Sequence, residues 1–274
     1  MEIQEIKNTP FTDSKFLEHV TSLSNHEKFE IFKKGYFLDN GVLYNIGNRD
    51  YVDYRPSIKI TQKDLEKKGI SFLHLDSLIY EQVKDISKNI EYKDLIIKKS
   101  DYSIRMNLPA SYDLYLENLG KKKRHELKRK KSKFFSQLEV AELQSNKDKE
   151  IFQKFVEQHK LSDGEKGTFM NQEVELFFKN LLTINGWRIY SIENESELIS
   201  SAFVYENKNG CYLYNSTKNS KYNSINPGIV LIDLIIQKMI KEKKVFFDFL
   251  KGYDRYKLDL GGLPIQLYDL KILL

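Results

Sequence analysis

The sequence predicts an α/β fold with sheets flanked by helices. Strand-like and helix-like segments alternate along the first 110 residues. Further on, three strand candidates joined by short turns lead through a polar loop into a helix and another strand. Of the 274 residues, 41% are apolar and 13% aromatic. This is enough apolar material for the core of one large domain or two of ordinary size.

The first 110 residues contain short elements of both kinds. Residues 11–33 are predicted to form a helix, because Phe16, Leu17, Val20 and Leu23 recur at helical spacing. Further elements are expected as strands at 41–46, 51–54, 70–75, 95–98 and 103–108, and as helices at 61–68 and 78–89.

A basic segment follows a predicted helix at 108–119. Between Lys121 and Lys133 there are nine Lys and Arg residues and one Glu, whereas the whole chain has a formal net charge of only +5. The charge is therefore local, which favours a local anionic partner over a general nucleic-acid coat. Arg124 and Lys128 are i,i+4 neighbours and are candidates for a joint anion site. A solvated helix and an anionic membrane surface are the other interpretations.

The second half is predicted to place a helix start beside a strand end. Strands at 187–192, 198–205 and 210–215 precede a polar loop, and Pro227-Gly228 then opens an apolar helical run to Ile240. The free amides near Gly228, Ile229 and Val230 can cradle a pyrophosphate, and Gly228 allows close approach of the backbone. An ordinary helix start explains the same residues. Strands are expected at 245–250 and 264–274.

Asp248 interrupts the apolar strand at 245–250. A buried carboxylate is costly unless it is paired or hydrogen-bonded. The residue therefore forms either a structural ion pair, with Lys257 or Arg255 as partner, or part of a functional site.

We expect a cytoplasmic protein without a transmembrane segment. The chain has one cysteine, Cys211, in a predicted strand, which fits a reducing compartment and a buried thiol. The first thirty residues lack a signal pattern, and the apolar run at 229–240 is too short and too polar to span a bilayer.

The stretch from Phe247 to Gly262 resembles the closing motif of the CelD-like acetyltransferases, a branch of the GNAT superfamily related to the FemAB peptidyltransferases. The matching positions are Asp248, Leu250, Gly252, Asp254, Tyr256 and Lys257. Two other blocks match in order: the basic segment 121–134, and the strand end and helix start with Asn215, Ser216, Pro227 and Gly228. The resemblance extends from about Tyr112 to Leu274.

The resemblance implies tandem GNAT-like domains with mixed, mostly antiparallel sheets: a degenerate first domain at 1–110 and an acyltransferase domain at 111–274. It also implies transfer of an acyl group from acyl-CoA, without a metal, to an amine or hydroxyl. The acceptor would be a small molecule, glycan or peptide serving as a cell-envelope or polysaccharide precursor.

The resemblance further implies roles for particular residues. The residues implied to bind the acyl-CoA donor are Asn215, Ser216, Asn226, Pro227, Gly228, Ile229 and Val230. Tyr256 would protonate the leaving thiolate, Lys257 would neutralise a phosphate or polarise the carbonyl, and Asp248 would hold Lys257 or act as base.

Three further residues are candidates by resemblance. His159 is expected near the cleft, with a role at a helix C-terminus as the alternative. Tyr51 and Asp53 resemble an Asp-Tyr pair near the substrate cleft, with exposed strand-edge polar residues as the alternative.

Two other functions remain open. One is a FemAB-type transferase that uses aminoacyl-tRNA and grips RNA with the basic segment, although the chain lacks a long heptad insertion. The other is a non-catalytic GNAT-like module that binds an anionic glycan or lipid. The sequence does not determine the acceptor, the acyl chain or the oligomeric state.

Overall fold

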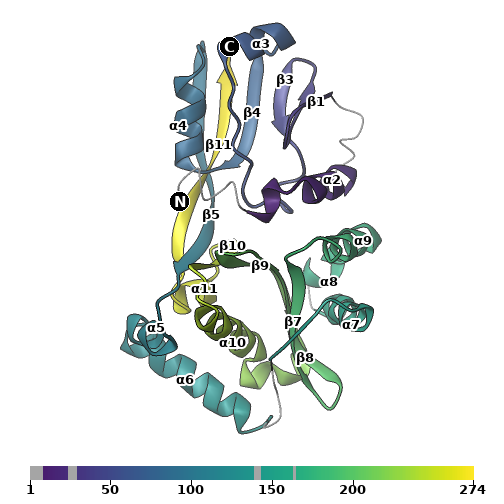
Figure 1. Ribbon diagram of the computed structural model, residues 1–274, viewed down its shortest axis with the longest axis vertical. Coiled ribbons are helices and arrows are strands. Elements are labelled where there is room, and N and C mark those ends of the chain that lie inside the picture. The colour runs from purple at the N-terminus through teal and green to yellow at the C-terminus, as the bar shows by residue number, and fades with distance from the viewer. Residues whose placement is uncertain (1–8, 24–29, 139–142, 163–164) are drawn as a thin grey trace. The chain divides into compact units, whose positions relative to one another are not determined.

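A computed structural model describes residues 9–23, 30–138, 143–162 and 165–274 and has the mixed α/β fold that the sequence predicts (Figure 1). The described residues divide into two compact units. Unit 1 contains those up to Ser103 with 251–253 and 264–274, and unit 2 contains those in 104–250 and 254–263. The C-terminal tail thus belongs to unit 1, although the sequence analysis assigned it to the second domain. The division into 1–110 and 111–274 stays a prediction.

Unit 1 is built on strands in the order β1-β2-β3-β4-β11-β5. The pairs β1–β2, β2–β3 and β4–β11 are antiparallel, and β3–β4 is parallel. The elements are η1 Pro10–Thr12, α2 Ser14–Leu23, β1 Glu30–Lys33, β2 Tyr36–Asp39, β3 Val42–Asn45, α3 Gln62–Lys68, β4 Phe72–Leu78, α4 Tyr80–Lys88, β5 Asp94–Asn107 and β11 Leu263–Leu273.

Three predictions for this half were wrong. The helix expected at 11–33 ends at Leu23, and Glu30–Lys33 forms β1. The strand expected at 51–54 is an irregular segment. The two strands expected at 95–98 and 103–108 are one long strand, β5, because a polar interruption does not end a strand whose backbone remains paired.

The strands of unit 2 lie in the order β10-β9-β8-β7-β6. The strands from β6 to β9 pair antiparallel, whereas β9 and β10 are parallel. The elements are α5 Tyr112–Asn118, α6 Lys121–Phe135, β6 Leu143–Asn146, α7 Lys149–Lys160, α8 Glu165–Phe169, α9 Gln172–Leu181, β7 Trp187–Asn194, β8 Glu197–Glu206, β9 Gly210–Lys218, η3 Ser220–Ile225, α10 Pro227–Lys241, β10 Phe246–Lys251 and α11 Arg255–Asp259.

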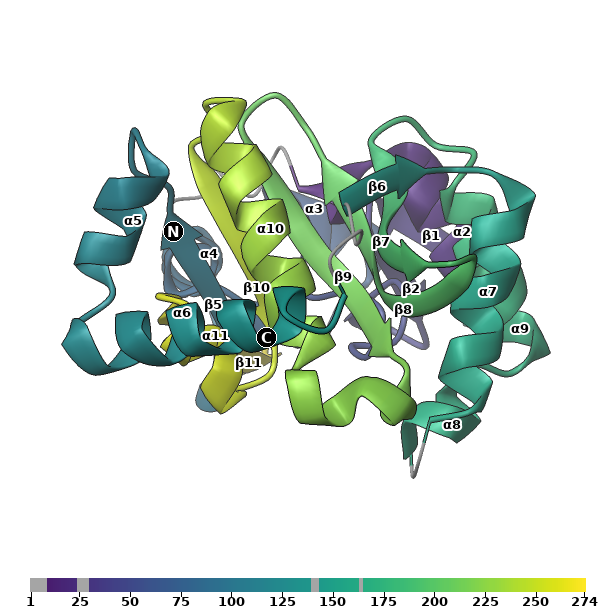
Figure 2. The ribbon, with the colours of Figure 1, turned by 90° about the horizontal axis from the view of Figure 1, so that it is seen from below.

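The helices of unit 2 cover both faces of these strands (Figure 2). On one face, α10 packs on alternate residues of β8 such as Ala202 and Val204. On the other face, Phe155 of α7 and Phe178 of α9 pack on Phe203 of β8. Successive residues of a strand point to opposite faces, so β8 and β9 each present side chains to both helix layers.

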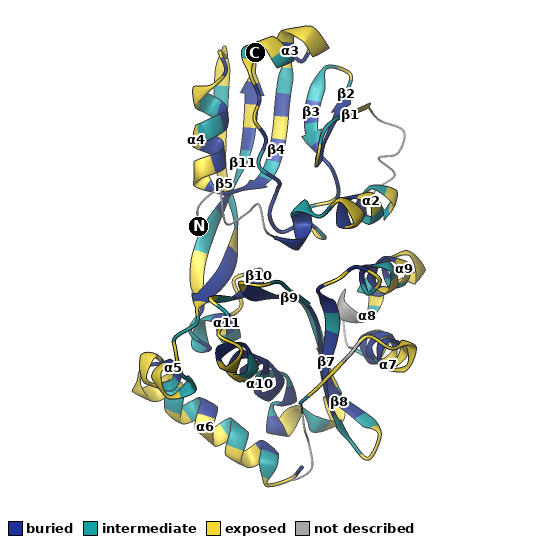
Figure 3. Cartoon of the chain, viewed as in Figure 1, coloured by how far each residue is buried: buried dark blue, intermediate teal, exposed yellow. Residues whose placement is uncertain are grey.

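Helix α10 is mostly buried, whereas α6 is largely exposed or half-buried (Figure 3). The one acidic residue of α10, Asp233, is buried and accepts hydrogen bonds from the Tyr112 hydroxyl at 2.8 and 2.9 Å. Lys131 of α6 pairs with it at 2.6 Å. Burial nevertheless raises the pKa of Asp233. In the part of the chain that the structure describes, no helix is both long and apolar enough to cross a membrane.

A buried arginine holds the irregular segment of unit 1. Arg55 is fully buried and binds both carboxylate oxygens of Asp76, at 2.7 and 3.0 Å, while Asp76 is 28% exposed. Burial acts to raise the pKa of Asp76, but Arg55 and the hydrogen bond from Ser77 outweigh it, so the pKa is lowered.

We expect Asp76→Asn to lower the free energy of unfolding by about 3 kcal/mol, because it leaves a buried guanidinium without its counter-ion. The Asp76 contribution is present above the pKa of the unfolded chain and is lost as pH falls through the lowered pKa of the folded state. Urea unfolding between neutral and acidic pH measures both effects. Glu30→Gln breaks the exposed ion pair with Lys68 and should change stability by under about 0.5 kcal/mol. Equal losses in the two variants would contradict the prediction.

Candidate active site

A cavity of about 340 Å³ lies at the start of α10, and we call it the α10 cavity. It lies between the end of β9, the first turn of α10 and the segment at α11. Its lining residues are Ser216, Thr217, Lys218, Asn226, Gly228, Ile229, Ile232, Asp254 and Tyr256. Ser216, Asn226, Gly228, Ile229 and Tyr256 are among the site residues named from the sequence. Asn215, Pro227 and Val230 are not among the described residues that line it.

The helix start leaves one amide available to a ligand. Asn226 precedes α10 in the left-handed conformation, with φ 55° and ψ 49°, and its carbonyl accepts the N–H groups of Ile229 and Val230 at 3.1 and 3.2 Å. Pro227 has no N–H. Among the described residues, no acceptor is found for the Gly228 N–H. Of the three amides predicted to cradle a phosphate, only that of Gly228 is therefore unengaged, at the positive end of the helix dipole.

Lys218 is a lining residue that the sequence reasoning missed. A Cβ placed on Gly228 would lie 3.8 Å from Lys218 Cδ, so this exposed side chain runs past the glycine. The sequence could have indicated Lys218, because side chains alternate along a strand and Ser216 and Lys218 therefore lie on the same face of β9. An ammonium beside the unengaged Gly228 amide makes this end of the cavity suited to an anion.

A β-bulge redirects β9 just before the cavity. Phe203 of β8 pairs with Asn215 and Val204 with Leu213, which leaves Tyr214 as an extra residue. Tyr214 packs on Trp187 of β7 and on Phe178 of α9, with ring centroids 5.1 and 5.5 Å apart, and Asn215 Oδ1 lies 2.7 Å from His159 Nε2 of α7. Two successive side chains thus face α7 and α9, as a bulge allows. The sequence around Tyr214 contains no glycine that would have predicted this β-bulge.

His159 and Asn215 are two predicted site residues that the fold brings together. His159 is 2% exposed, near the end of α7, and packs edge-on against Phe155. The alternative was that His159 only interacts with the dipole at the end of its helix. The contact of His159 with Asn215 of β9 is an additional interaction that this alternative does not include. Neither residue is among those described as lining the α10 cavity, so they lie behind the strand end rather than in the cavity wall.

Asp248 is part of a buried ion pair, but with a partner that the sequence did not indicate. Arg105 Nε lies 2.8 Å from Asp248 Oδ2, whereas Lys257 and Arg255 were the expected partners. The second carboxylate oxygen accepts the Leu250 N–H at 2.8 Å. The Arg105 guanidinium also lies over the Phe246 ring, 4.2 Å from its centroid. Arg105 comes from β5, so only long-range packing could reveal it.

The turn after β10 places Tyr256 in the cavity wall. Burial, with Asp254 nearby, raises the pKa of the Tyr256 phenol well above its ordinary value. The phenol therefore stays protonated at neutral pH. Lys257 is buried and pairs with Asp254 at 3.2 Å, which ties the cavity-lining carboxylate to α11.

The remaining candidates lie elsewhere. Arg124 donates to the Leu116 carbonyl at 3.4 Å, and Lys128 is exposed. In unit 1, Asp53 is buried and accepts the Lys251 N–H at 3.2 Å, so its interpretation as an exposed strand-edge residue was wrong. The Tyr51 N–H donates to the Asn48 carbonyl at 3.0 Å.

One family model matches part of this sequence, and several solved structures are similar to this chain in fold. A model described as an acetyltransferase (GNAT) domain matches residues 121–258. No curated protein matches the sequence.

Three solved structures illustrate the similarity in fold. A conserved protein of unknown function from Bacteroides thetaiotaomicron is 12% identical, with a TM-score of 0.62 over 100% of this chain and 98% of that one. FemX is 10% identical, with a TM-score of 0.59 over 98% and 96%. The C-terminal domain of a putative lysylphosphatidylglycerol synthetase from Agrobacterium fabrum is 9% identical, with a TM-score of 0.58 over 94% and 91%. At these identities the similarity concerns the fold alone.

We expect Asp248→Asn to lower the free energy of unfolding by about 3–5 kcal/mol, because Arg105 is left buried and uncompensated. Asparagine keeps the oxygen that accepts the Leu250 N–H, so urea unfolding isolates the charge. The double variant Asp248→Asn/Arg105→Met should recover much of the loss. A single variant with wild-type stability would show that the ion pair is not structural.

Proposed function

The chain belongs to the acetyltransferase (GNAT) domain family, and on that premise we propose that it is an acyltransferase that moves an acyl group from acyl-CoA to an amine or hydroxyl. The α10 cavity is the observation that carries the proposal. It combines an anion-binding helix start with a phenol that stays protonated, and both are needed to bind a phosphate-bearing thioester and release its thiol.

The donor would bind at the start of α10. Coenzyme A carries phosphates, and the Gly228 amide with the Lys218 ammonium supplies a hydrogen-bond donor and a positive charge for them. Ser216 and Asn226 add polar groups to the same wall. Gly228 matters because a side chain there would stand between the backbone and the ligand.

The acyl group would lie in the gap between β9 and β10. Among the described residues, β10 and β9 pair from Phe246↔Gly210 to Asp248↔Tyr212, and no further pair of these two strands is described although β9 continues to Lys218. A gap with unpaired backbone groups can hold a carbonyl in position for direct attack. Tyr256 would then protonate the leaving thiolate.

We assign supporting roles to three of the other candidates. Asp248 would shape the gap through its ion pair with Arg105, rather than act as base or hold Lys257. Lys257 would position Asp254 in the cavity wall. His159 would position Asn215 at the bulge. Each of these side chains has a described partner in the protein: Arg105 for Asp248, Asp254 for Lys257 and Asn215 for His159.

The resemblance to CelD-like acetyltransferases supports a cell-envelope or polysaccharide precursor as the acceptor. A FemAB-type transferase using aminoacyl-tRNA is the second candidate, because α6 keeps exposed cations such as Lys121, Lys122 and Lys128 that suit a polyanion. A non-catalytic GNAT-like module that binds an anionic glycan or lipid is the third.

Gly228→Ala tests donor binding. The new Cβ meets only ordinary van der Waals contact with Lys218, and alanine favours a helix over glycine by up to about 1 kcal/mol, so the melting temperature should not fall. Affinity for coenzyme A, measured by calorimetry, should drop about tenfold, which is roughly 1.4 kcal/mol. Gly120→Ala, at an open position, is the matched control. Tight binding of charged tRNA without binding of coenzyme A would favour the second candidate.

Tyr256→Phe tests the proposed acid. Turnover of acetyl-CoA, followed by release of free thiol with an amine acceptor, should fall about 100-fold, while KM for acetyl-CoA stays within about twofold. Tyr253→Phe, at an exposed neighbouring tyrosine, should behave as wild type. Unchanged turnover in Tyr256→Phe would remove the phenol from the mechanism.

A further inference from the structure

Helix α6 carries a row of cations on its solvent side, and we call this side the α6 face. It consists of exposed lysine and arginine side chains on one side of the helix: Lys121, Lys122, Lys128, Arg129 and Lys133. At about 3.6 residues per turn, these positions fall within an arc of about 140°. The opposite side of the helix carries the buried Leu127 and Phe134, so the α6 face points away from the core.

Most of the charge on the α6 face is not used inside the protein. The one acidic residue of the helix, Glu126, pairs with Arg129 at 2.8 Å and lies 3.7 Å from Lys130. The Arg129 hydrogen bond, with Lys130 nearby, lowers the pKa of the Glu126 carboxyl to about 2. Among the described residues, the four lysines of the α6 face have no acidic partner. These four ammonium groups are therefore available to a partner outside the chain.

The α6 helix is fixed beside the α10 cavity. The Lys123 ammonium donates to the Leu258 carbonyl of α11 at 2.7 Å, and Lys131 pairs with Asp233 of α10 at 2.6 Å. Figure 2 shows α6 passing next to both of these helices. Tyr256, two residues before Leu258, lines the cavity. A partner bound to the α6 face would therefore lie close to the proposed donor site.

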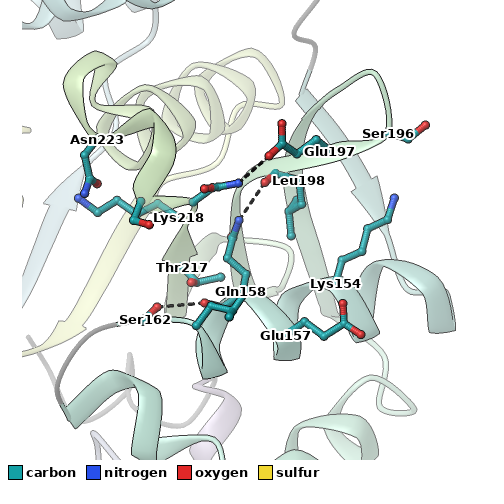
Figure 4. Close-up of a pocket in the computed structure, with 13 residues that line it drawn as sticks. Lys154, Glu157, Gln158, Ser162, Ser196, Glu197, Leu198, Thr217, Lys218 and Asn223 are labelled. Atoms are coloured by element: carbon teal, nitrogen blue, oxygen red, sulfur yellow. Dashed lines mark hydrogen bonds between the residues drawn. The ribbon is translucent and has the colours of Figure 1, made fainter.

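The α10 cavity offers few groups to phosphates. The Asn226 carbonyl takes the N–H groups of Ile229 and Val230, which leaves the Gly228 N–H. Among the described lining residues, Lys218 is the one cation. In Figure 4, which shows a neighbouring cavity of about 480 Å³, Lys218 points toward Asn223 of η3 and away from Gln158 of α7.

One amide and one ammonium match one phosphate group better than several. Coenzyme A carries a diphosphate and a ribose phosphate next to its pantetheine. The phosphopantetheine arm of a carrier protein carries a single phosphodiester and the same thioester. The cavity therefore suits the arm, and it leaves the nucleotide part of coenzyme A without a described cationic partner.

We propose that an acidic carrier protein delivers the acyl group, binding the α6 face while its acylated phosphopantetheine arm enters the α10 cavity. This proposal rests on the proposed function, because it needs acyl transfer in that cavity. An acidic protein surface complements the α6 face in charge, which speeds encounter and sets the orientation of the two proteins.

A carrier protein accounts for the α6 face and the cavity together. RNA and an anionic membrane would also match the charge of the α6 face, but neither brings a phosphopantetheine thioester to the cavity. The exposed residues of α6 include no Phe, Tyr or Trp on which bases could stack. They also include no aliphatic residue that could enter a bilayer.

The transfer step is the same from either donor. The acceptor amine or hydroxyl attacks the thioester carbonyl carbon, so that a C–N or C–O bond forms and the C–S bond breaks. The attacking group releases one proton to solvent. The departing thiolate takes one proton from Tyr256, which is reprotonated from solvent. The products are the acylated acceptor and a carrier protein with a free thiol.

Calorimetry with the full chain tests the proposal without an acceptor. The probes are a bacterial acyl carrier protein bearing phosphopantetheine, coenzyme A, and free phosphopantetheine. The carrier should bind about tenfold more tightly than coenzyme A, because it adds contacts on the α6 face. The same carrier without its arm should bind more weakly than the carrier that bears it.

Lys122→Glu/Lys133→Glu reverses two charges of the α6 face. The Kd of the carrier should rise about tenfold in this variant, and the difference from wild type should shrink at about 0.5 M salt. The Kd of free phosphopantetheine should stay within about twofold, because the arm alone binds in the cavity. Both lysines are exposed, so the melting temperature should not change.

Lys149→Glu/Lys208→Glu is the matched control. It changes the net charge by the same amount at two exposed lysines outside α6. This control should bind the carrier as the wild type does. An equal loss of carrier binding in both double variants would show an effect of net charge and would overturn the proposal.

The remaining outcomes separate the proposal from the proposed function. Binding of coenzyme A with no tighter binding of the carrier overturns the proposal and leaves the proposed function standing. Without a preference for the carrier, α6-dependent binding of charged tRNA or of phosphatidylglycerol vesicles also overturns it and assigns the α6 face to that partner. Failure of all three phosphopantetheine probes to bind overturns both the proposal and the proposed function.

Discussion

The buried ion pair between Arg105 and Asp248 lies at the point where the described pairing of β10 with β9 ends. One carboxylate oxygen of Asp248 holds Arg105, and the other takes the Leu250 N–H. That N–H is therefore withdrawn from the strand ladder, and Leu250 adopts a left-handed conformation with φ 60°. Register pairing with β9 stops at Asp248↔Tyr212. Asp248 is thus both the residue that holds Arg105 and the last residue of β10 for which pairing with β9 is described.

Beyond this point β9 continues to Lys218, and its last residues line the α10 cavity. Ser216 pairs with Ala202 of β8, and Ser216, Thr217 and Lys218 all line the α10 cavity. The bulge at Tyr214 turns two further side chains toward α7 and α9.

The basic helix shows that one charge run can have two roles. Lys123 donates to the Leu258 carbonyl at 2.7 Å, and Lys131 pairs with the buried Asp233. These contacts attach α6 to α11 and α10. The helix needs them because its buried apolar residues are only Leu127 and Phe134, too few to anchor fifteen residues by packing alone. The cations that remain exposed are those available to an anionic partner.

Local patterns in the sequence determined the elements around the site. The Pro-Gly pair and the apolar period predicted α10, aromatic-rich runs predicted β9 and β10, and the motif near Tyr256 predicted a residue that lines the α10 cavity. These features depend on residues a few positions apart, where periodicity and backbone preference act directly.

Tertiary structure alone decided which groups meet. Arg105 reaches Asp248 across 143 positions, His159 reaches Asn215 across 56, and the C-terminal strand joins unit 1. A charge or hydroxyl in the sequence shows what it can bind but not which partner the folded chain brings to it. Partner choice depends on the packing of distant segments, and for that reason the sequence did not indicate Arg105 as a partner of Asp248.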